Sequence, residues 1–527
     1  MSSSETLHRP ARNAAAPRLR RPEAGSVFFG LTIALGTAIT MVFALSVTQW
    51  TVVGLAVMPL LALNAAWISG GAATAIIGLC RKSPHCGPPP APAWHPTGRT
   101  AILLTLCREP PGPAAAYLRD LHARLGRAGL SGDTCIFVLS DTTGSAAIAR
   151  EEAALRDLVA AGKVQYRRRN ANTGRKPGNI ADWLRRHGDD FDYMLVLDAD
   201  SRMSAGRIRR MIHQIETRPR TGLLQAGMGL VPGHTRFGRH QRVAVRLMSS
   251  NFGRGMAAWA GRTGNYWGHN AIMRVAAFRD AVNLPTLAGR PPFGGPILSH
   301  DFIEAAWIRK AGWTVELDPD LAGSAEDAPQ TLAAFHKRDR RWCQGNLQHL
   351  RVLVRRGLHP MSRFHLASGV LSYLAAPAWL LLVIAIASGA VTVAGALPFA
   401  TVAAVLMLPK LCALAGRIRR DRTMRRRLLT LRAWLGELTT SSLVAPIMMI
   451  RQTGAVLSVL AGRDCGWKSG RTARWRIPRG LPEATAGAAI TLLAVLSGSG
   501  MTPWLSPLIL PLLGAPLITR LLDAPAS

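Results

Sequence analysis

Three stretches of the chain carry no formally charged residue, and they frame a long polar region. The stretches are residues 24–80, 364–409 and 484–519. Because a membrane-spanning helix needs about 20 apolar residues, the first two stretches each predict a pair of spans. The third has room for one span, or for two short spans joined by a turn near residues 500–503.

A different pattern fills the polar region between the first two stretches. Short apolar runs at 101–106, 135–139 and 193–197 alternate with amphipathic segments of helix length. Strand-sized runs separated by helices predict βαβ units, and therefore an α/β domain with a mostly parallel sheet. Such sheets bind ligands beyond the carboxyl ends of their strands, so we expect functional residues there.

Residues 438–461 are also apolar and long enough to span a membrane, but Arg451 and Gln452 lie in the middle of them. Basic residues lie on both sides, so a single crossing would place one basic cluster outside the cell. We therefore favour a helix in the cytoplasmic interface, with room for a break near Pro446, over a true span.

Lys and Arg residues flank the outer side of each apolar stretch, whereas the turn inside each pair of spans is uncharged. Since basic residues stay on the cytoplasmic side, each pair is predicted to be a hairpin of a membrane protein whose polar domain is cytoplasmic. The predicted organisation is a basic N-terminal arm (1–25), two membrane helices (26–80), a Pro-rich linker (81–98), the α/β domain (99–350), an interfacial segment (351–363), two membrane helices (364–416), a basic interfacial region (417–480) and one or two membrane helices (484–520).

The composition agrees with this organisation. The chain has 64 Lys and Arg residues against 30 Asp and Glu residues, for a net charge of +34. In a soluble protein this charge would indicate nucleic acid. Membrane orientation and contact with anionic lipid explain it here, so we expect no nucleic-acid partner. The seven cysteines show no metal-ligand spacing, which favours reduced cytosolic thiols over disulfides or a zinc site.

The strongest chemical signal is Asp198-Ala199-Asp200, which directly follows the apolar run at 193–197. Two carboxylates one residue apart at a strand end can share Mg²⁺ or Mn²⁺. The cation would neutralise a diphosphate leaving group. An ordinary turn with capping aspartates is the alternative, and these residues alone do not decide between the two.

Two candidate regions for binding a phosphorylated donor precede this strand. Residues 167–179 combine several Lys and Arg residues with two glycines, and glycines allow the backbone to approach a phosphate. Lys176 and Asn179 are the candidate donor-binding residues of this segment. Asp141 likewise lies just after an earlier strand. A solvated basic loop and a turn-forming aspartate are the alternatives.

Three later segments contribute the remaining candidates. Asp301 begins an amphipathic helix, and it either accepts the proton of an attacking hydroxyl or caps that helix. Arg341 and Trp342 lie in a basic segment that either binds diphosphate and a sugar ring or precedes the membrane as an interfacial helix. His269 and Asn270, in a Gly- and aromatic-rich segment, belong either to an acceptor channel or to a packed loop.

The order of these motifs resembles the series of processive family 2 glycosyltransferases, such as cellulose and hyaluronan synthases. That series is an aspartate, Asp-x-Asp, a Thr-Glu-Asp-like motif and Gln-x-x-Arg-Trp. The segments GRKPGNIADW, LVLDADS, GHNAIMR, SHDFIEAAWIRKAGW and KRDRRWCQGNLQH are similar to one branch, the glucans biosynthesis glucosyltransferase H family of osmoregulated periplasmic glucan synthesis. The resemblance covers roughly residues 95–480.

The resemblance implies a GT-A-like glycosyltransferase domain, UDP-glucose as donor and a growing β-linked glucan as acceptor. It also implies a divalent metal, contact with membrane lipid and a periplasmic glucan-processing protein as partner. By matching position, Asp141 and Asp198 would contact the uridine part, and Asp200 would hold the metal and diphosphate together with Asp198.

The same resemblance implies roles for the later residues. Asp301 would be the catalytic base, Arg341 would bind diphosphate, and Trp342 would stack at the acceptor site. The segment that begins at Cys465 and continues with Gly and Trp resembles, in its placement, the gating loop of cellulose synthases.

The chain departs from the family pattern at several positions. The first strand of relatives ends in an Asn-Glu-Asp-like sequence, whereas here Glu109 supplies the acidic group and Pro110 changes the backbone that follows. Arg338 stands where the family has Gln. The N-terminal arm is also short beside the extensions of many relatives, so a regulatory role housed there is in doubt.

These features predict an inverting hexosyltransferase that polymerises glucose and couples synthesis to export. The nearest alternative is a glycosyltransferase that makes a single transfer to a lipid acceptor, which product length would distinguish. A transporter would keep ionisable groups within its spans, and these stretches hold almost none. A membrane-tethered nucleic-acid binder leaves the aspartate series unexplained.

Overall fold

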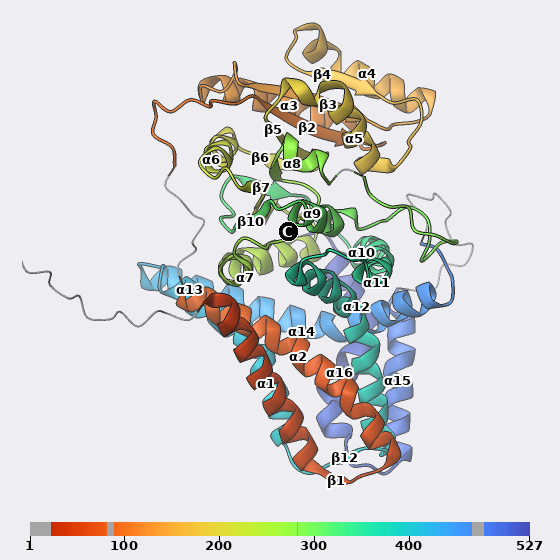
Figure 1. Ribbon diagram of the computed structural model, residues 1–527. Helices are drawn as coiled ribbons and strands as arrows, with labels where there is room; N and C mark the ends of the chain where they lie inside the picture. Colours follow the sequence, from red (N-terminus) through yellow and green to blue (C-terminus); the bar gives the residue numbers. More distant parts are fainter. Residues whose placement is uncertain (1–22, 82–88, 282, 466–478, 527) are drawn as a thin grey trace, which may run out of the picture.

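The structure is a computed structural model that describes residues 23–81, 89–281, 283–465 and 479–526. An α/β domain lies on one side of a bundle of long apolar helices (Figure 1). Its seven-stranded sheet has the order β10-β7-β9-β5-β2-β3-β4. The bounds are β2 (Thr100–Leu106), β3 (Thr134–Ser140), β4 (Gln165–Arg168), β5 (Tyr193–Asp198), β7 (Thr221–Ala226), β9 (Ala271–Arg274) and β10 (Thr314–Asp318). Strand β9 is antiparallel to both neighbours and the other pairs are parallel, which confirms the predicted sheet.

The apolar runs become central strands because both faces of the sheet are covered. Along β2, Ile102 and Leu104 pack on one face, while Ala101 and Leu103 pack on the other. Successive side chains of a strand point to opposite faces, so a continuous apolar run fits a sheet between two helical layers. One layer is α3 (Pro111–Arg127), α4 (Ser145–Ala160) and α6 (Ala205–Glu216); the other is α5 (Arg175–His187), α8 (Val275–Arg279) and α9 (His300–Lys310).

Smaller elements connect this domain to the apolar helices. A three-stranded sheet joins β6 (Arg202–Met203), β11 (Ser324–Glu326) and β8 (Gly229–Leu230), and a short 3₁₀ helix, η1, spans Gly188–Asp190. Helices α7 (Arg236–Ala260), α10 (Leu332–Gln348) and α11 (Leu350–Leu353) lie between the sheet and the bundle (Figure 1).

Five helices of the described chain are long and apolar enough to cross a membrane: α1 (Ala24–Ser46), α2 (Val52–Cys80), α12 (Pro360–Ala387), α13 (Leu397–Ile418) and α14 (Met424–Leu460). A shorter apolar helix, α15 (Leu481–Leu496), precedes α16 (Thr502–Leu513) and α17 (Ala515–Asp523), which form a pair bent by 52°. The two predicted hairpins correspond to α1 with α2 and to α12 with α13. Their tips meet in a small sheet of β1 (Val47–Gln49) and β12 (Thr392–Val393), far from the α/β domain (Figure 1).

Helix α14 contains residues 438–460 of the predicted segment but starts 14 residues earlier than expected, within the basic cluster. It continues through Pro446, so the break considered at that proline is absent. Although α14 has the length and composition of a span, it lies across the bundle, crosswise to α1, α12 and α15 (Figure 1). This orientation supports the proposal of an interfacial helix.

Helix α7 is fastened to the end of α2 nearest the α/β domain. The Asn251 Nδ2 atom donates to the Ala75 carbonyl at 2.9 Å, and the Trp259 Nε1 atom donates to the Thr74 hydroxyl at 3.1 Å. Glycines at the crossing let the two backbones touch. These contacts tie the sheet domain directly to the first hairpin.

Candidate active site

The carboxyl ends of β2, β3 and β5 open into one cavity of about 1230 Å³. Every predicted site residue except Asn270 lines it: Glu109, Asp141, Lys176, Asn179, Asp198, Asp200, His269, Asp301, Arg341 and Trp342. Asp200 and Asp301, which lie far apart in the chain, therefore face a common space. A shared reaction centre requires this arrangement.

Asp198, the last residue of β5, forms an ion pair with Lys176. Lys176, in the first turn of α5, donates to Asp198 Oδ1 and to the Gly268 carbonyl, the latter at 2.7 Å. Thr105 also donates to Asp198 Oδ1, at 3.2 Å. Burial would raise the pKa of Asp198, but Lys176 and His269 overcome this effect and lower it to about 2. Asp198 is therefore ionised at physiological pH.

Asp200, in the turn after β5, faces other carboxylates. Desolvation and the negative charges of Asp198 and Glu326 raise the pKa of Asp200, against the opposing effect of His269. His269 Nε2 lies 3.3 Å from Glu326 Oε2. Burial would lower the pKa of His269, yet Asp198 and Glu326 raise it to about 9. His269 thus lines the cavity close to Asp198 and Glu326.

Sequence reasoning missed Glu326. No motif marks this residue; it reaches the site because β11 pairs with β6, which follows the Asp-x-Asp turn directly. Pairing between segments more than a hundred residues apart carries no local sequence signal.

The acidic side chains fit a divalent cation that also binds a diphosphate. Among the residues that the structure describes, no group of three His, Cys, Asp or Glu side chains could hold a metal alone. Mg²⁺ typically uses one or two carboxylates together with substrate phosphates, so Asp198 and Asp200 suffice. The mutual repulsion that raises the pKa of Asp200 is the kind that a bound cation relieves.

Asp141 holds the basic loop in place. Its carboxylate accepts two hydrogen bonds from Arg169, at 2.7 and 2.8 Å. Arg169 also donates to the carbonyls of Thr173 and Arg175, at 2.9 and 3.1 Å. The pair therefore orders the backbone that leads into Lys176. The sequence offered several arginines here, and only the fold selects Arg169.

The glycines of this loop serve its tight conformation. A Cβ atom at Gly178 would lie 2.1 Å from the Thr173 carbonyl oxygen, and Gly174 has a φ of +69°. Both positions exclude larger residues for internal reasons, so the expected approach of glycine backbone to phosphate lacks support. Asn179 has a similar internal role, because its side-chain oxygen accepts a hydrogen bond from Arg167.

Asp301 lies in the first turn of α9, where Ser299 occupies the N-cap position. The Ser299 side chain makes no cap hydrogen bond, whereas the Asp301 carboxylate accepts from the Phe302 backbone, so Asp301 interacts with the start of the helix as well as facing the cavity. Its Oδ2 atom lies 3.5 Å from where a Cβ of Gly268 would be, and the Gly268 carbonyl accepts from Lys176. Burial raises the pKa of Asp301, which favours its use as a proton acceptor.

Helix α10 carries the Arg-Trp motif, and its Arg341 and Trp342 line the same cavity. The Arg338 guanidinium lies 4.5 Å from the centre of the Trp342 ring, whose side chain is 47% exposed. Arg338 covers one face of the indole, so a sugar can stack only on the other. Gln344 donates to Asp464 at 2.7 Å and accepts from the Cys465 backbone at 2.8 Å. The remainder of the expected gating loop lies outside the described residues.

Two further candidate residues make contacts within the protein that the sequence did not indicate. Asn270 is fully buried and donates to the Ser324 hydroxyl at 3.0 Å, which agrees with the alternative of a packed loop. Glu109 lines the cavity while accepting a hydrogen bond from the Cys107 backbone. Pro110 is the N-cap residue of α3, so it starts a helix without disturbing the preceding strand.

The cavity continues among the apolar helices. Its lining there includes Phe28 and Thr32 of α1, Trp67 and Gly70 of α2, Phe364, Ser368 and Ser372 of α12, and Val405 and Pro409 of α13. Aromatic and hydroxyl side chains thus extend the site toward the bundle.

Comparison with known proteins gives the family. The model for glycosyl transferase family group 2 matches residues 193–409. Glucans biosynthesis glucosyltransferase H of Vibrio cholerae is 39% identical over 86% of this chain and 68% of its own. The chain belongs to this family of glucosyltransferases. The corresponding protein of Bradyrhizobium diazoefficiens is 40% identical over 85% of this chain and 65% of its own, so the chain spans about two thirds of the length of these family members.

A solved structure shows a distant likeness. The mannosyltransferase PcManGT from Pyrobaculum calidifontis, in complex with GDP-Man and Mn²⁺, is 13% identical, covers 78% of this chain and 99% of its own, and has a TM-score of 0.47.

Proposed function

We propose that the protein transfers glucose from UDP-glucose to the end of a β-linked glucan, with inversion at the anomeric carbon, and exports the product. The observation that carries the proposal is the continuity of the cavity. One space is lined by Asp198, Asp200 and Asp301 at the sheet and by side chains of four apolar helices beyond it. A product that leaves the site would enter this passage directly.

The donor side of the cavity offers groups of suitable charge. Asp200, with Asp198, would hold a divalent cation, which when bound supplies positive charge to the departing diphosphate. Lys176 fixes Asp198 in its ionised form, and Arg341 adds a second cation near the diphosphate. Asp141 contributes by ordering the loop before Lys176 through Arg169. These residues bind and orient the donor without forming a covalent intermediate.

The acceptor side is proposed around Asp301 and Trp342. The exposed face of Trp342 stacks on the terminal sugar of the acceptor. This stacking places a hydroxyl of that sugar against the anomeric carbon of the donor glucose. Asp301 takes the hydroxyl proton as the oxygen attacks, and the bond to the diphosphate breaks with its electron pair leaving on UDP. Positioning and charge stabilisation supply the catalysis.

Replacement of Asp301 by Asn tests the base. A general base typically contributes 10²- to 10⁴-fold, so we expect transfer to fall by about 1,000-fold while the affinity for UDP-glucose changes by less than about threefold. Calorimetric titration of the purified protein measures the affinity for UDP-glucose, and the amount of radiolabelled product measures transfer. Asp157→Asn on the exposed side of α4 is the matched control and should leave both unchanged.

Turnover above about one tenth of wild type would remove Asp301 from the role of base.

The size of the wild-type product tests the other part of the proposal. A product with one added glucose on lipid, in place of a polymer, would replace polymerisation with single transfer to a lipid acceptor.

A further inference from the structure

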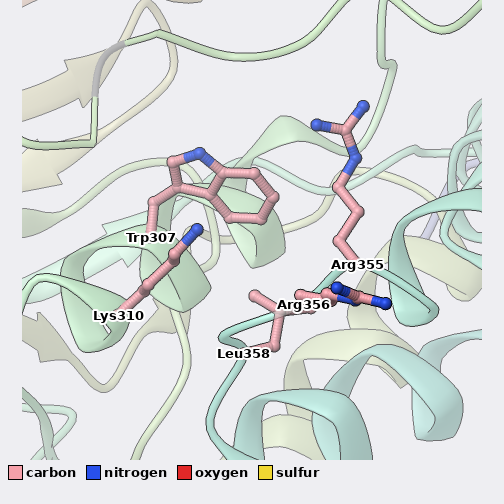
Figure 2. Close-up of a pocket in the computed structure, with 5 residues that line it drawn as sticks. All are labelled: Trp307, Lys310, Arg355, Arg356 and Leu358. Atoms are coloured by element: carbon pink, nitrogen blue, oxygen red, sulfur yellow. The ribbon is translucent and has the colours of Figure 1, made fainter.

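A second cavity, of about 320 Å³, lies apart from the active site. It is lined by Trp307, Lys310, Arg355, Arg356 and Leu358. Figure 2 shows Trp307 and Lys310 projecting from the end of α9 toward the loop that carries the other three residues. Three cations, one aromatic ring and one aliphatic side chain therefore surround a single space, which we call the α9–α12 pocket.

The cations of this pocket lack acidic partners among the residues that the structure describes. Within the described part of the chain, no carboxylate forms an ion pair with Lys310, Arg355 or Arg356. Like charges that share a small space repel one another, and a bound anion relieves that repulsion. Arginine in particular suits phosphate, because its planar guanidinium can donate two parallel hydrogen bonds.

The loop that carries the arginines is held in its shape by other contacts. Arg363, in the first turn of α12, donates to the Arg355 carbonyl at 2.6 Å and also to the Leu353 carbonyl. Gly357, at a φ of +82°, packs so closely that an added Cβ would lie 3.0 Å from Lys310 Cε. Leu358 also shares a buried apolar cluster with Ile303 and Ala306 of α9, so the loop packs against both α12 and α9.

The position of the pocket relative to the apolar helices identifies its ligand. Arg355 and Arg356 come shortly before α12, which starts at Pro360 and is long and apolar enough to cross a membrane. No charged residue follows Arg363 until Lys410. The pocket thus lies at the level where α12 enters the apolar phase, and Trp307 is of a type enriched at that boundary. The positive end of the α12 dipole also points toward this loop.

We propose that the α9–α12 pocket binds the phosphate of an anionic membrane phospholipid. Lys310, Arg355 and Arg356 contact the phosphate, and Trp307 and Leu358 pack against the glycerol region and the first methylenes. Free inorganic phosphate could contact the same cations, but it has no apolar part that packs against Trp307 and Leu358. The bound lipid links the C-terminal end of α9, the helix that carries Asp301, to the first turn of α12.

Native mass spectrometry of the detergent-purified full-length protein tests the proposal. The dissociation constant of the first bound phosphatidylglycerol is measured, with phosphatidylcholine and inorganic phosphate as alternative probes. One basic residue near an anionic lipid is worth about fivefold in affinity. We therefore expect Lys310→Gln to weaken the first phosphatidylglycerol about fivefold and Arg355→Gln/Arg356→Gln about 25-fold.

The matched control is Arg425→Gln/Arg426→Gln, which removes the same charge from exposed positions at the start of α14. The control should bind within about twofold of wild type, and equal weakening would show diffuse attraction and overturn the pocket. Arg355→Lys/Arg356→Lys keeps the charge and should retain affinity within about fivefold. Equal loss in the lysine and glutamine variants would overturn the charge-based explanation, even if the glutamine variant folds poorly.

The other probes separate the sources of the phosphate. Phosphatidylcholine should bind more weakly than phosphatidylglycerol and should not respond to the pocket variants. Millimolar inorganic phosphate should not displace the first phosphatidylglycerol. Displacement by phosphate, or equal affinity for the two lipids, would overturn the assignment to an anionic lipid.

Discussion

Replacing Gly255 by alanine should push α7 away from α2. A Cβ atom at Gly255 would lie 1.9 Å from the Thr74 carbonyl oxygen, and one at Gly78 would lie 2.0 Å from the Asn251 carbonyl oxygen. Real Cβ atoms do not approach other atoms closer than 3.0 Å, so the two helices must separate by about 1 Å to accept the methyl group. Backbone lines both sides of the crossing, so side-chain rotation offers no relief.

The cost follows from three contributions. Overpacking of a close contact costs about 1–3 kcal/mol. The hydrogen bonds from Asn251 to Ala75 and from Trp259 to Thr74, at 2.9 and 3.1 Å, would stretch beyond hydrogen-bonding range, at about 1 kcal/mol each. The higher helix propensity of alanine relative to glycine offsets about 1 kcal/mol of this cost. We therefore expect Gly255→Ala to lower the free energy of unfolding by about 3 kcal/mol.

Thermal unfolding in detergent measures the effect. For a cooperative unit of 150–250 residues, about 3 kcal/mol corresponds to a fall in Tm of about 6–12 °C. Gly30→Ala in α1 is the control, because no atom lies within 4 Å of the added methyl group, and its Tm should equal or slightly exceed that of wild type. If Gly255→Ala and Gly30→Ala unfolded at the same temperature, the backbone contact between α2 and α7 would not exist.

Three further predictions concern the active site. Asp141→Asn breaks a buried ion pair with Arg169, so the free energy of unfolding should fall by about 3 kcal/mol. UDP-glucose should also bind more weakly. An unchanged Tm together with an unchanged affinity for UDP-glucose would contradict this prediction. Because burial raises the pKa of Asp301, kcat should fall with decreasing pH in a range above the ordinary aspartate value, and a profile flat down to about pH 4 would argue against a base of this kind. Chelation should abolish transfer and Mg²⁺ should restore it, while Asp200→Asn should raise the Mg²⁺ concentration needed by about tenfold or more; full activity with chelator would exclude the metal.

Local sequence signals determined the strands and the order of the motifs. Apolar runs bounded by polar residues predicted β2, β3 and β5, because a central strand buries both of its faces over a few residues. The Asp-x-Asp pair then had to fall at the carboxyl end of β5, beside the end of β2 and one strand away from the end of β3. Uncharged stretches likewise predicted the two hairpins of apolar helices, since the length that spans a membrane is a property of continuous sequence.

Only the tertiary structure decided which partners these residues have. Glu326 joins Asp200 through the pairing of β11 with β6, and Asp141 selects Arg169 from a run of arginines. Asn270 sits in a motif that looks functional, yet it is buried behind the cavity wall. The passage from the sheet into the helix bundle is also a tertiary result. Periodicity and spacing report the environment of neighbouring residues, whereas a cavity or an ion pair depends on how distant segments pack, and the sequence carries no local trace of that packing.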